Sequence, residues 1–385
     1  MAKTTGDTAL IKKMNLSIVL EEIIRRGPLS RAAISGTTGL NKATVSSLVQ
    51  HLIDGQLVLE LGPGESSGGR KPVMLTFNRA AGYAVGVDLG VNYIRGALTD
   101  LDGNLIAERE YPLAGTGLEA AVAELCACIG ELIAAAPSSP YGIVGIGVGV
   151  PGIVDGAGMI LLAPNLGWQQ VALRARLEER FGVPVTIDNE ANAGAQGEQR
   201  YGAGRGIANQ IYVSVGIGIG TGLILGGELY RGASGYSGEL GHLSIELAGK
   251  PCRCGNRGCW ELYASENALL EQAEPLGYSS LRALLEAAGD GSEDARRLFY
   301  GIGTHLGAGI ASIANIFNPD AVIVGNRMSR ARRWLEEALR DTIAARALPH
   351  HRGDLRILFA ELGERSAMRG AASEAIERFL ARIHD

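Results

Sequence analysis

The sequence predicts an α/β protein in which a small winged helix-turn-helix domain precedes a larger α/β body with a metal-binding loop. Three observations predict this. Residues 1–80 show helical periodicity followed by two short strands. From residue 83 onward, glycine-punctuated strands alternate with helices, and three cysteines cluster in one loop. A chain of 385 residues with 46% hydrophobic content can form two or three domains with hydrophobic cores.

Charge is distributed unevenly along the chain. The net charge is −5, but residues 1–80 contain ten Lys/Arg and six Asp/Glu, which leaves +4 there and −9 on the remainder. A basic end attached to an acidic body indicates one segment that contacts nucleic acid and one that does not. The sequence shows no signal peptide and no run long enough to span a bilayer, so we expect a cytoplasmic protein with reduced cysteines.

The N-terminal segment is predicted to contain three helices. Apolar residues repeat at helical spacing over 16–24, and a Gly-Pro pair ends that helix. Ser30 is placed to cap a short second helix, which a turn at 36–39 would end. Asn41 is placed to cap a third helix that continues to about Asp54.

The third helix has one apolar face and one face of small, polar side chains. Small side chains let a helix backbone approach DNA, and Gln or Ser can bond base edges in the major groove. Two short strands at 57–60 and 73–76 follow, joined by a glycine-rich loop whose cations suit a narrow minor groove. The residues expected to contact DNA are Arg31, Lys42, Thr44, Ser47, Gln50, Arg70 and Lys71. The alternatives are a small helical dimerisation module for the domain and a solvated loop for the wing.

The loop between residues 239 and 261 is predicted to hold zinc. Its cysteines lie among Gly, Arg and Asn rather than in an apolar core. Three thiolates and one imidazole complete a tetrahedral zinc site of the structural kind, with one ion per chain. The expected zinc ligands are His242, Cys252, Cys254 and Cys259. The alternative is three unrelated thiols in a loop.

The same loop carries a family resemblance. E-x-x-H, then C-x-C-G-x-x-G-C-x-E beginning ten positions after the histidine, resembles the zinc signature of the ROK family (repressors, open reading frames and sugar kinases). The resemblance covers about residues 83–385, and the winged helix-turn-helix at 1–77 resembles the DNA-binding domain of ROK repressors. It implies the duplicated, two-lobed actin-like (ribonuclease H-like) fold of sugar kinases, which the strand pattern alone does not distinguish from other α/β arrangements.

The expected division of the chain follows from this resemblance. Residues 78–82 would form a hinge between the head and the sugar-binding domain at 83–385. The small lobe would comprise about 83–190 plus the C-terminal helix, and the large lobe about 191–372.

The resemblance also implies a sugar pocket. Carboxylates and amides suit the vicinal hydroxyls of a sugar because each hydroxyl both donates and accepts hydrogen bonds. The expected sugar-binding residues are Gly152, Asn165, Asn189, Glu190, Glu239, His242 and Glu261, with Gly149 beside them. For Glu239 and Glu261 the alternative is to orient the zinc ligands, and for Asn165 it is to form a turn.

Catalytic elements of ROK kinases are altered here. The family's general base is the Asp of N-D-x-N, but residues 189–192 read N-E-A-N, so Glu190 stands at the base position. One extra methylene moves that carboxylate, and misplacement of about 1 Å can cost about a hundredfold in rate. The family's D-x-G-G-T reads D-L-G-V-N at 88–92, while the second glycine-rich loop, GIGIGTG, is intact in outline. We therefore expect no catalytic residues and no kinase activity.

The sequence favours a sugar-responsive repressor of carbohydrate-utilisation genes. A homodimer, or a dimer of dimers, would bind a pseudo-palindromic operator and leave it when a monosaccharide binds. The alternative is an ATP-dependent sugar kinase with an added DNA-binding domain. A third reading is an activator or a regulator controlled by a protein partner. Regulators of this organisation resemble those for xylose, glucose or N-acetylglucosamine, which the shared pocket residues do not separate.

Overall fold

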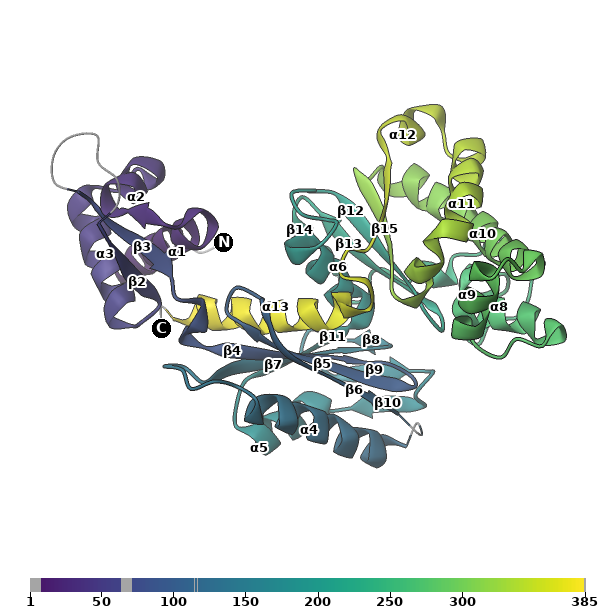
Figure 1. Cartoon of the computed structure of the whole chain (residues 1–385), viewed down its shortest axis with the longest axis horizontal. Coiled ribbons are helices and arrows are strands. Elements are labelled where there is room, and N and C mark those ends of the chain that lie inside the picture. The colour runs from purple at the N-terminus through teal and green to yellow at the C-terminus, as the bar shows by residue number, and fades with distance from the viewer. Residues whose placement is uncertain (1–7, 64–70, 114, 116, 384–385) are drawn as a thin grey trace.

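The computed structural model describes residues 8–63, 71–113, 115 and 117–383 and divides the chain into a head and two lobes (Figure 1). The head lies beside one end of the last helix, α13 (Ser366–Arg382), and the two lobes lie along the rest of it. Among the described residues, no helix is long and apolar enough to cross a membrane.

The head has the element order of a winged helix-turn-helix. Its elements are α1 (Thr8–Arg26), β1 (Leu29–Ser30), α2 (Arg31–Thr38), α3 (Lys42–Asp54), β2 (Val58–Pro63) and β3 (Val73–Phe77), with sheet order β1-β3-β2. Both expected caps form, since Ser30 Oγ accepts from Ala33 N–H at 3.1 Å and Asn41 Oδ1 accepts from Thr44 N–H at 2.8 Å. The turn expected at 36–39 is wrong in extent, because α2 continues to Thr38 and only Gly39, at φ 73°, ends it.

The small lobe is a five-stranded sheet with helices on its outer face. Its elements are β4 (Tyr83–Leu89), β5 (Tyr93–Asp100), β6 (Leu105–Pro112), α4 (Leu118–Ala134), β7 (Ile143–Val150), α5 (Leu173–Phe181) and β11 (Val185–Asn189), with sheet order β11-β7-β4-β5-β6. Cys126 and Cys128 lie on α4, half-buried and buried respectively, as expected of packing residues. A small sheet of β8 (Ile153–Val154), β9 (Ile160–Ala163) and β10 (Trp168–Val171) was not predicted, because such short strands leave little periodicity.

The large lobe repeats this topology. Its sheet, in the order β14-β13-β12-β15-β16, consists of β12 (Gln210–Val215), β13 (Ile219–Leu225), β14 (Glu228–Leu229), β15 (Ala321–Gly325) and β16 (Arg356–Phe359). Its helices are α7 (Glu261–Ala264), α8 (Glu266–Ala273), α9 (Leu281–Gly289), α10 (Glu293–Phe317), α11 (Arg332–Arg346) and α12 (Pro349–Asp354). In both lobes three antiparallel strands are extended by two parallel ones. The duplicated fold implied by the resemblance is therefore confirmed.

Two helices join the parts of the molecule. The helix α6 (Glu190–Tyr201) follows β11 and packs tightly against α13: a methyl group on Gly370 would lie 1.7 Å from the carbonyl oxygen of Ala193. Only glycine fits such an approach. The far end of α13 enters the hydrophobic core of the head, where Ala375 and Ile376 are buried.

The segment expected to act as a hinge is packed between the head and the small lobe. It forms a short 3₁₀ turn, Arg79–Ala81, and Ala81 is fully buried in the core that head, small lobe and α13 share. Nearby, Tyr141 donates its hydroxyl to the carbonyl oxygen of Gly55 at 2.7 Å and packs edge-on against Phe379. The head is therefore attached by side-chain packing as well as by its linker, and bending at 78–82 stays a prediction.

Candidate functional site

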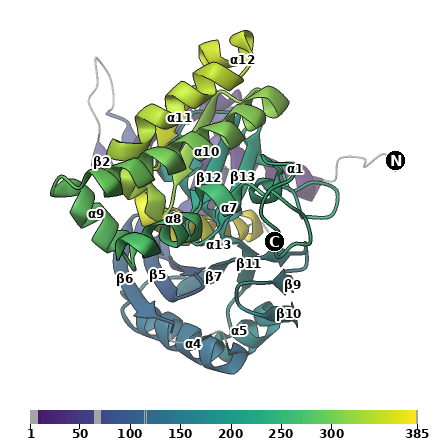
Figure 2. The ribbon, with the colours of Figure 1, turned by 90° about the vertical axis from the view of Figure 1, so that its right-hand side faces the viewer.

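The candidate site lies where the two lobes face each other (Figure 2). The small lobe contributes the end of β11 and the start of α6, and the large lobe contributes the glycine-rich turn between β12 and β13 and the loop that follows β14. These elements lie together because α6 packs on both β12 and β13 of the large lobe. Sequence segments far apart along the chain therefore meet between the two lobes, and this region is called the cleft below.

Glu190 lies at the centre of this cleft. A methyl group on Gly220 would lie 3.2 Å from Glu190 Oε1, and one on Gly149 would lie 3.2 Å from Glu190 Cα. Burial, and then the negative charges of Asp88 and Glu239, raise the pKa of Glu190 to about 8. The carboxyl of Glu190 therefore holds its proton at neutral pH and can donate as well as accept hydrogen bonds.

Asn189 and Gly152 have structural tasks at the edge of the cleft. Asn189 caps α6, since its Oδ1 accepts from the N–H groups of Ala191 and Asn192 at 2.8 and 3.3 Å. Its Nδ2 donates to the carbonyl oxygen of Gly152 at 2.9 Å. A side chain at Gly152 would meet β9, because a methyl group there would lie 2.4 Å from the carbonyl oxygen of Leu162.

Asn165 is exposed in the turn between β9 and β10. It is the one expected sugar-binding residue for which the structure gives no contact to the rest of the cleft.

The four expected metal ligands come together and could hold a metal ion. Their ligand atoms all lie within 4.8 Å of one another, with 3.6 Å from His242 Nδ1 to Cys252 Sγ and 3.7 Å from Cys254 Sγ to Cys259 Sγ. Positive φ angles at Gly255 (92°) and Gly258 (69°) fold the loop tightly enough for this.

The two glutamates flank the imidazole of His242. Glu261 Oε1 lies 3.4 Å from His242 Nδ1 and 3.5 Å from Cys252 Sγ, whereas Glu239 Oε2 lies 4.0 Å from His242 Nε2. Glu261 also lies over the glycine-rich turn, where a methyl group on Gly218 would be 2.8 Å from its Oε2. Residues 239–261, called the metal loop below, thus line the side of the cleft that faces Glu190.

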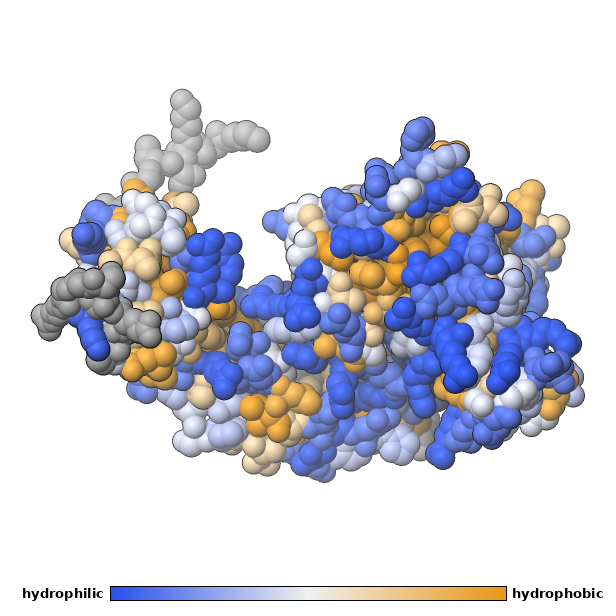
Figure 3. Space-filling model, turned by 45° about the horizontal axis from the view of Figure 1, so that its top comes forward, coloured by the Kyte–Doolittle hydropathy of each residue, from blue (hydrophilic) through white to orange (hydrophobic). Residues whose placement is uncertain are grey.

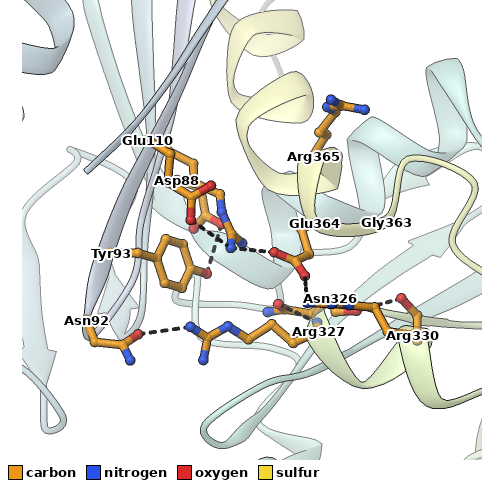
Figure 4. Close-up of polar contacts among 12 residues, drawn as sticks. Asp88, Asn92, Tyr93, Glu110, Asn326, Arg327, Arg330, Gly363, Glu364 and Arg365 are labelled. Carbon is orange, nitrogen blue, oxygen red and sulfur yellow. Dashed lines mark hydrogen bonds and ion pairs between the residues drawn. The ribbon is translucent and has the colours of Figure 1, made fainter. Parts of the chain in front are cut away.

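The other end of the cleft holds an interlobe network, defined here by Asn92, Tyr93, Arg95, Glu266, Arg327, Arg330 and Glu364 (Figure 4). Arg327 of the large lobe donates to Glu266 Oε1 at 3.1 Å and, across the cleft, to Asn92 Oδ1 at 3.3 Å. The guanidinium groups of Arg95 and Arg327 lie 4.3 and 5.3 Å from the centre of the Tyr93 ring.

Glu364 completes this network. Its carboxylate pairs with Arg95 of the small lobe and lies 3.5 Å from Arg330 of the large lobe. Sequence reasoning missed these residues, because no spacing rule connects Asn92 with a partner 235 positions later. The one available signal was the altered sequence at 88–92. A cavity of about 330 Å³ remains beside the network, lined by it together with the start of α9.

Asp88 lies behind the network. Tyr93 Oη donates to Asp88 Oδ2 at 3.0 Å, and burial raises the pKa of Asp88 to about 6 although the positive charges of Arg95 and Arg327 oppose the shift. The place of the altered first phosphate motif is therefore occupied by protein side chains, although Asp88 Oδ1 and Arg95 Nη1 are buried without a hydrogen-bond partner among the described residues.

The residues expected to contact DNA differ in their exposure and in whether their side chains already form hydrogen bonds within the head. Lys42, Ser47 and Lys71 are exposed, and Thr44 is half-buried. Gln50 is exposed and donates to Asp54 Oδ1 at 2.8 Å. Arg31 is half-buried and donates to Glu60 from both terminal nitrogens at 3.0 Å, so it stabilises the head. Arg70 lies outside the described residues.

Known proteins resemble the chain over nearly its whole length. Residues 84–378 match the ROK family. The chain is 43% identical to the xylose repressor of Bacillus spizizenii over 379 residues, covering 97% of this chain and 98% of that protein. A crystal structure of a ROK family transcriptional regulator, a homolog of the E. coli MLC protein, matches with a TM-score of 0.83 and 29% identity, covering 97% of this chain and 98% of that one. The ROK glucokinase of Streptomyces griseus with glucose and AMPPNP matches with a TM-score of 0.71 and 30% identity, over 77% of this chain and 99% of that one.

Fold, site and relatives define a sugar-responsive transcriptional repressor. The chain belongs to the ROK family. The kinase relative matches only 77% of the chain, whereas the regulators match the head as well.

Proposed function

We propose that this repressor binds operator DNA as a homodimer and is released by D-xylose. The observation that carries the proposal is the 43% identity to a xylose repressor, which extends over head and lobes alike. The cleft supports it, since a protonated Glu190 and the carboxylate of Glu239 offer both donors and acceptors to vicinal hydroxyls. Glu239 is half exposed, so a ligand can reach it.

The residues expected to bind sugar differ in whether we propose that they contact it directly. Glu190, Glu239, His242 and Glu261 converge on the cleft and are the contacts we favour. Gly152 and Asn189 act indirectly, because they hold the start of α6. Asn165 would have to reach the sugar from an exposed turn, which requires the β9–β10 turn to close on the ligand.

Zinc is the metal we propose for the four-ligand cluster. A tetrahedral ion with zinc–sulfur bonds of about 2.3 Å sets its sulfur ligands about 3.8 Å apart, and the Cys254–Cys259 separation of 3.7 Å fits. His242 would bind through Nδ1, the nitrogen nearest Cys252, so that Nε2–H stays free to donate toward Glu239 or a sugar oxygen. The ion's task is structural, because three sulfurs and one nitrogen leave no position for water.

A kinase activity is disfavoured by both ends of the cleft. At the base position Glu190 replaces the family's Asp, and its extra methylene displaces the carboxylate. A pKa near 8 also leaves only about a tenth of this group ionised at pH 7, which lowers its effectiveness as a base by about tenfold. At the opposite end, Arg327 and Tyr93 lie against the altered first phosphate motif. We therefore propose that the lobes bind sugar without phosphorylating it.

The homodimer gives two heads for two operator half-sites. Apolar surface gathers on the large lobe (orange in Figure 3), and Tyr300, Ile316 and Leu348 are among its large exposed apolar side chains. Such a surface suits contact with a second copy. The cytoplasm is the expected location, since metal binding needs reduced thiols.

The test combines sugar titration with DNA binding. Calorimetric titration with D-xylose, D-glucose and N-acetylglucosamine should show binding of xylose, and xylose should weaken retention of a duplex that the protein itself selects from a randomised pool. Gln50→Ala should reduce preference for that duplex by about 1 to 3 kcal/mol without changing xylose affinity, with Gln169→Ala as the control. Sugar-dependent ADP formation with Mg-ATP would instead support the kinase alternative.

A further inference from the structure

Arg231 connects the two lobes at a point away from the interlobe network. It lies in the large lobe, in the loop of residues 230–238 that leads from β14 to Glu239. Its Nη2 lies 2.7 Å from Asp188 Oδ2 at the end of β11 and 3.8 Å from Glu374 Oε1 on α13. The side chain of Arg231 in the loop of residues 230–238 therefore contacts both β11, which precedes Glu190, and α13, which extends to the head.

The two carboxylates that Arg231 contacts are buried, with exposures of 5% and 8%. Asp188 Oδ1 accepts from Asn189 N–H at 2.7 Å and from Asn192 Nδ2 at 3.1 Å, while Glu374 Oε1 accepts from Arg378 at 2.9 Å. Arg378 reaches only Glu374, so Arg231 is the cation that pairs with Asp188 among the described residues. Removing one partner of a buried pair leaves a charge without compensation. The position of Arg231 is thus strongly defined.

Hydrogen bonds close the loop that carries Arg231 at both ends. Ser237 N–H donates to the carbonyl oxygen of Arg231 at 3.2 Å, which closes the loop on itself. At its far end, the hydroxyl of Thr221 bonds the carbonyl oxygen of Gly238, the residue before Glu239. These bonds tie the residues between Arg231 and Glu239 into one closed turn that is anchored on β13.

The contact on α13 gives a displacement of this loop a route to the DNA-binding head. Glu374 directly precedes Ala375 and Ile376 in the chain, and both of these residues are buried in the hydrophobic core of the head. Phe379, one turn further, packs against the ring of Tyr141, whose hydroxyl bonds the head at Gly55. A rigid helix thus leads from the Arg231 contact into the packing of the head.

We propose that Arg231 is the positioning residue that couples sugar occupancy to operator release, through Asp188 and Glu374. This inference rests on the proposed function, and it assigns the coupling to one interlobe contact rather than to bending at 78–82. Arg231 itself need not touch the sugar. Its loss should therefore separate sugar affinity from the DNA response, which loss of a sugar ligand or of general stability would not do.

The experiment measures both quantities on the full-length protein. D-xylose affinity is obtained by calorimetry, and affinity for the selected duplex is measured with and without saturating xylose. Coupling of this kind is typically about 5- to 150-fold. In Arg231→Gln we expect the xylose-induced loss of DNA affinity to fall below about twofold, with xylose affinity in the absence of DNA within about threefold of the unmodified protein. Arg176→Gln, which removes an exposed pair with Glu119 inside the small lobe, is the control and should keep the full response.

Two results for Arg231→Gln would overturn the proposal. A preserved DNA response would show that coupling does not pass through this contact. A loss of xylose affinity of tenfold or more would place Arg231 in the sugar site itself. If that variant does not fold, Arg231→Lys and Glu374→Gln replace it: retained coupling in the first with reduced coupling in the second supports the proposal, and the reverse refutes it. If the unmodified protein does not respond to xylose, it is the proposed function that fails.

Discussion

The two ends of the interlobe cleft differ in how their charged groups are satisfied. At the metal-loop end, Glu190 is half-buried with a pKa near 8, and Glu239 and Glu261 flank the imidazole of His242 without a lysine or arginine partner among the described residues. At the opposite end, Arg327 and Glu266 pair directly and the interlobe network continues across the cleft. The metal-loop end therefore offers a ligand carboxyl groups that have no cationic partner. At the network end most charged groups are paired within the protein, although Arg95 Nη1 has no hydrogen-bond partner among the described residues.

This difference gives a physical reason for our proposal that the lobes bind sugar without phosphorylating it. The arginines at the network end could pair with phosphate only by leaving Glu266 and Glu364, which they already meet. A sugar site needs mixed donors and acceptors, which the metal-loop end supplies. The protein contacts at the network end also hold the lobes together without a nucleotide.

The largest expected effect concerns the metal loop. Cys254→Ser removes the exposed thiol of the cluster, so the protein should lose the proposed zinc ion and, with it, the position of Glu239 and Glu261. We expect metal content measured by mass spectrometry to fall from one ion per chain to near zero and xylose affinity to fall at least about tenfold. Cys126→Ser on α4 is the matched control and should change neither. Full sugar affinity in metal-free Cys254→Ser would show that the metal loop does not shape the pocket.

The second effect concerns the network end. Arg327 and Glu266 are largely buried, with side-chain exposures of 19% and 8%, so Arg327→Ala leaves a buried carboxylate unpaired. We expect the free energy of unfolding, measured with denaturant, to fall by about 2 to 4 kcal/mol, and xylose affinity to change little. Arg332→Ala, whose pair with Glu336 is a neighbouring-turn pair on α11, should cost about 0.5 kcal/mol or less. Equal losses in the two variants would mean that the Arg327–Glu266 pair stabilises the protein no more than an exposed pair does.

The fold was more predictable from sequence than the cleft. The sequence predicted the helix caps Ser30 and Asn41 and the metal cluster correctly, because caps and cluster are formed by residues close together in the chain. The interlobe network and the Arg231 contact join residues from separate lobes, so only the packing of α6 and α13 brings them together. Asn189 was expected to bind sugar, but in the structure its side-chain oxygen caps α6. The resemblance to sugar-binding proteins did not predict this role.

The pH dependence of stability should distinguish the two ends. The pKa of Glu190 rises from an ordinary 4.5 to about 8, so the folded protein keeps a proton that the unfolded chain loses, and stability should fall as pH rises from about 5 to 8. Asp88 behaves likewise, but only between about 4 and 6. Glu190→Gln should therefore flatten the thermal-stability profile up to pH 8. Asp88→Asn should flatten it mainly below about pH 6, and it should also lower the pKa of Glu190, because the charge of Asp88 contributes to that shift. The expected change in melting temperature is about 1 to 4 °C, and identical profiles for both variants would contradict the assignment.

The smallest expected effect isolates the hydrogen bond that crosses the cleft from Arg327 to Asn92. At 3.3 Å and largely exposed, it should contribute no more than about 0.5 kcal/mol, so Asn92→Ala should barely change the free energy of unfolding. In the Arg327→Ala background the same substitution should have no effect, because its partner is already gone, and a double-mutant cycle measures that difference. A coupling well above 1 kcal/mol would mean that this one bond, rather than the buried Arg327–Glu266 pair and the stacking on Tyr93, closes the network end of the cleft. A value near zero would place the stabilisation within the large lobe, and the lobes would then be held mainly by Arg95, Glu364 and the α6–α13 packing.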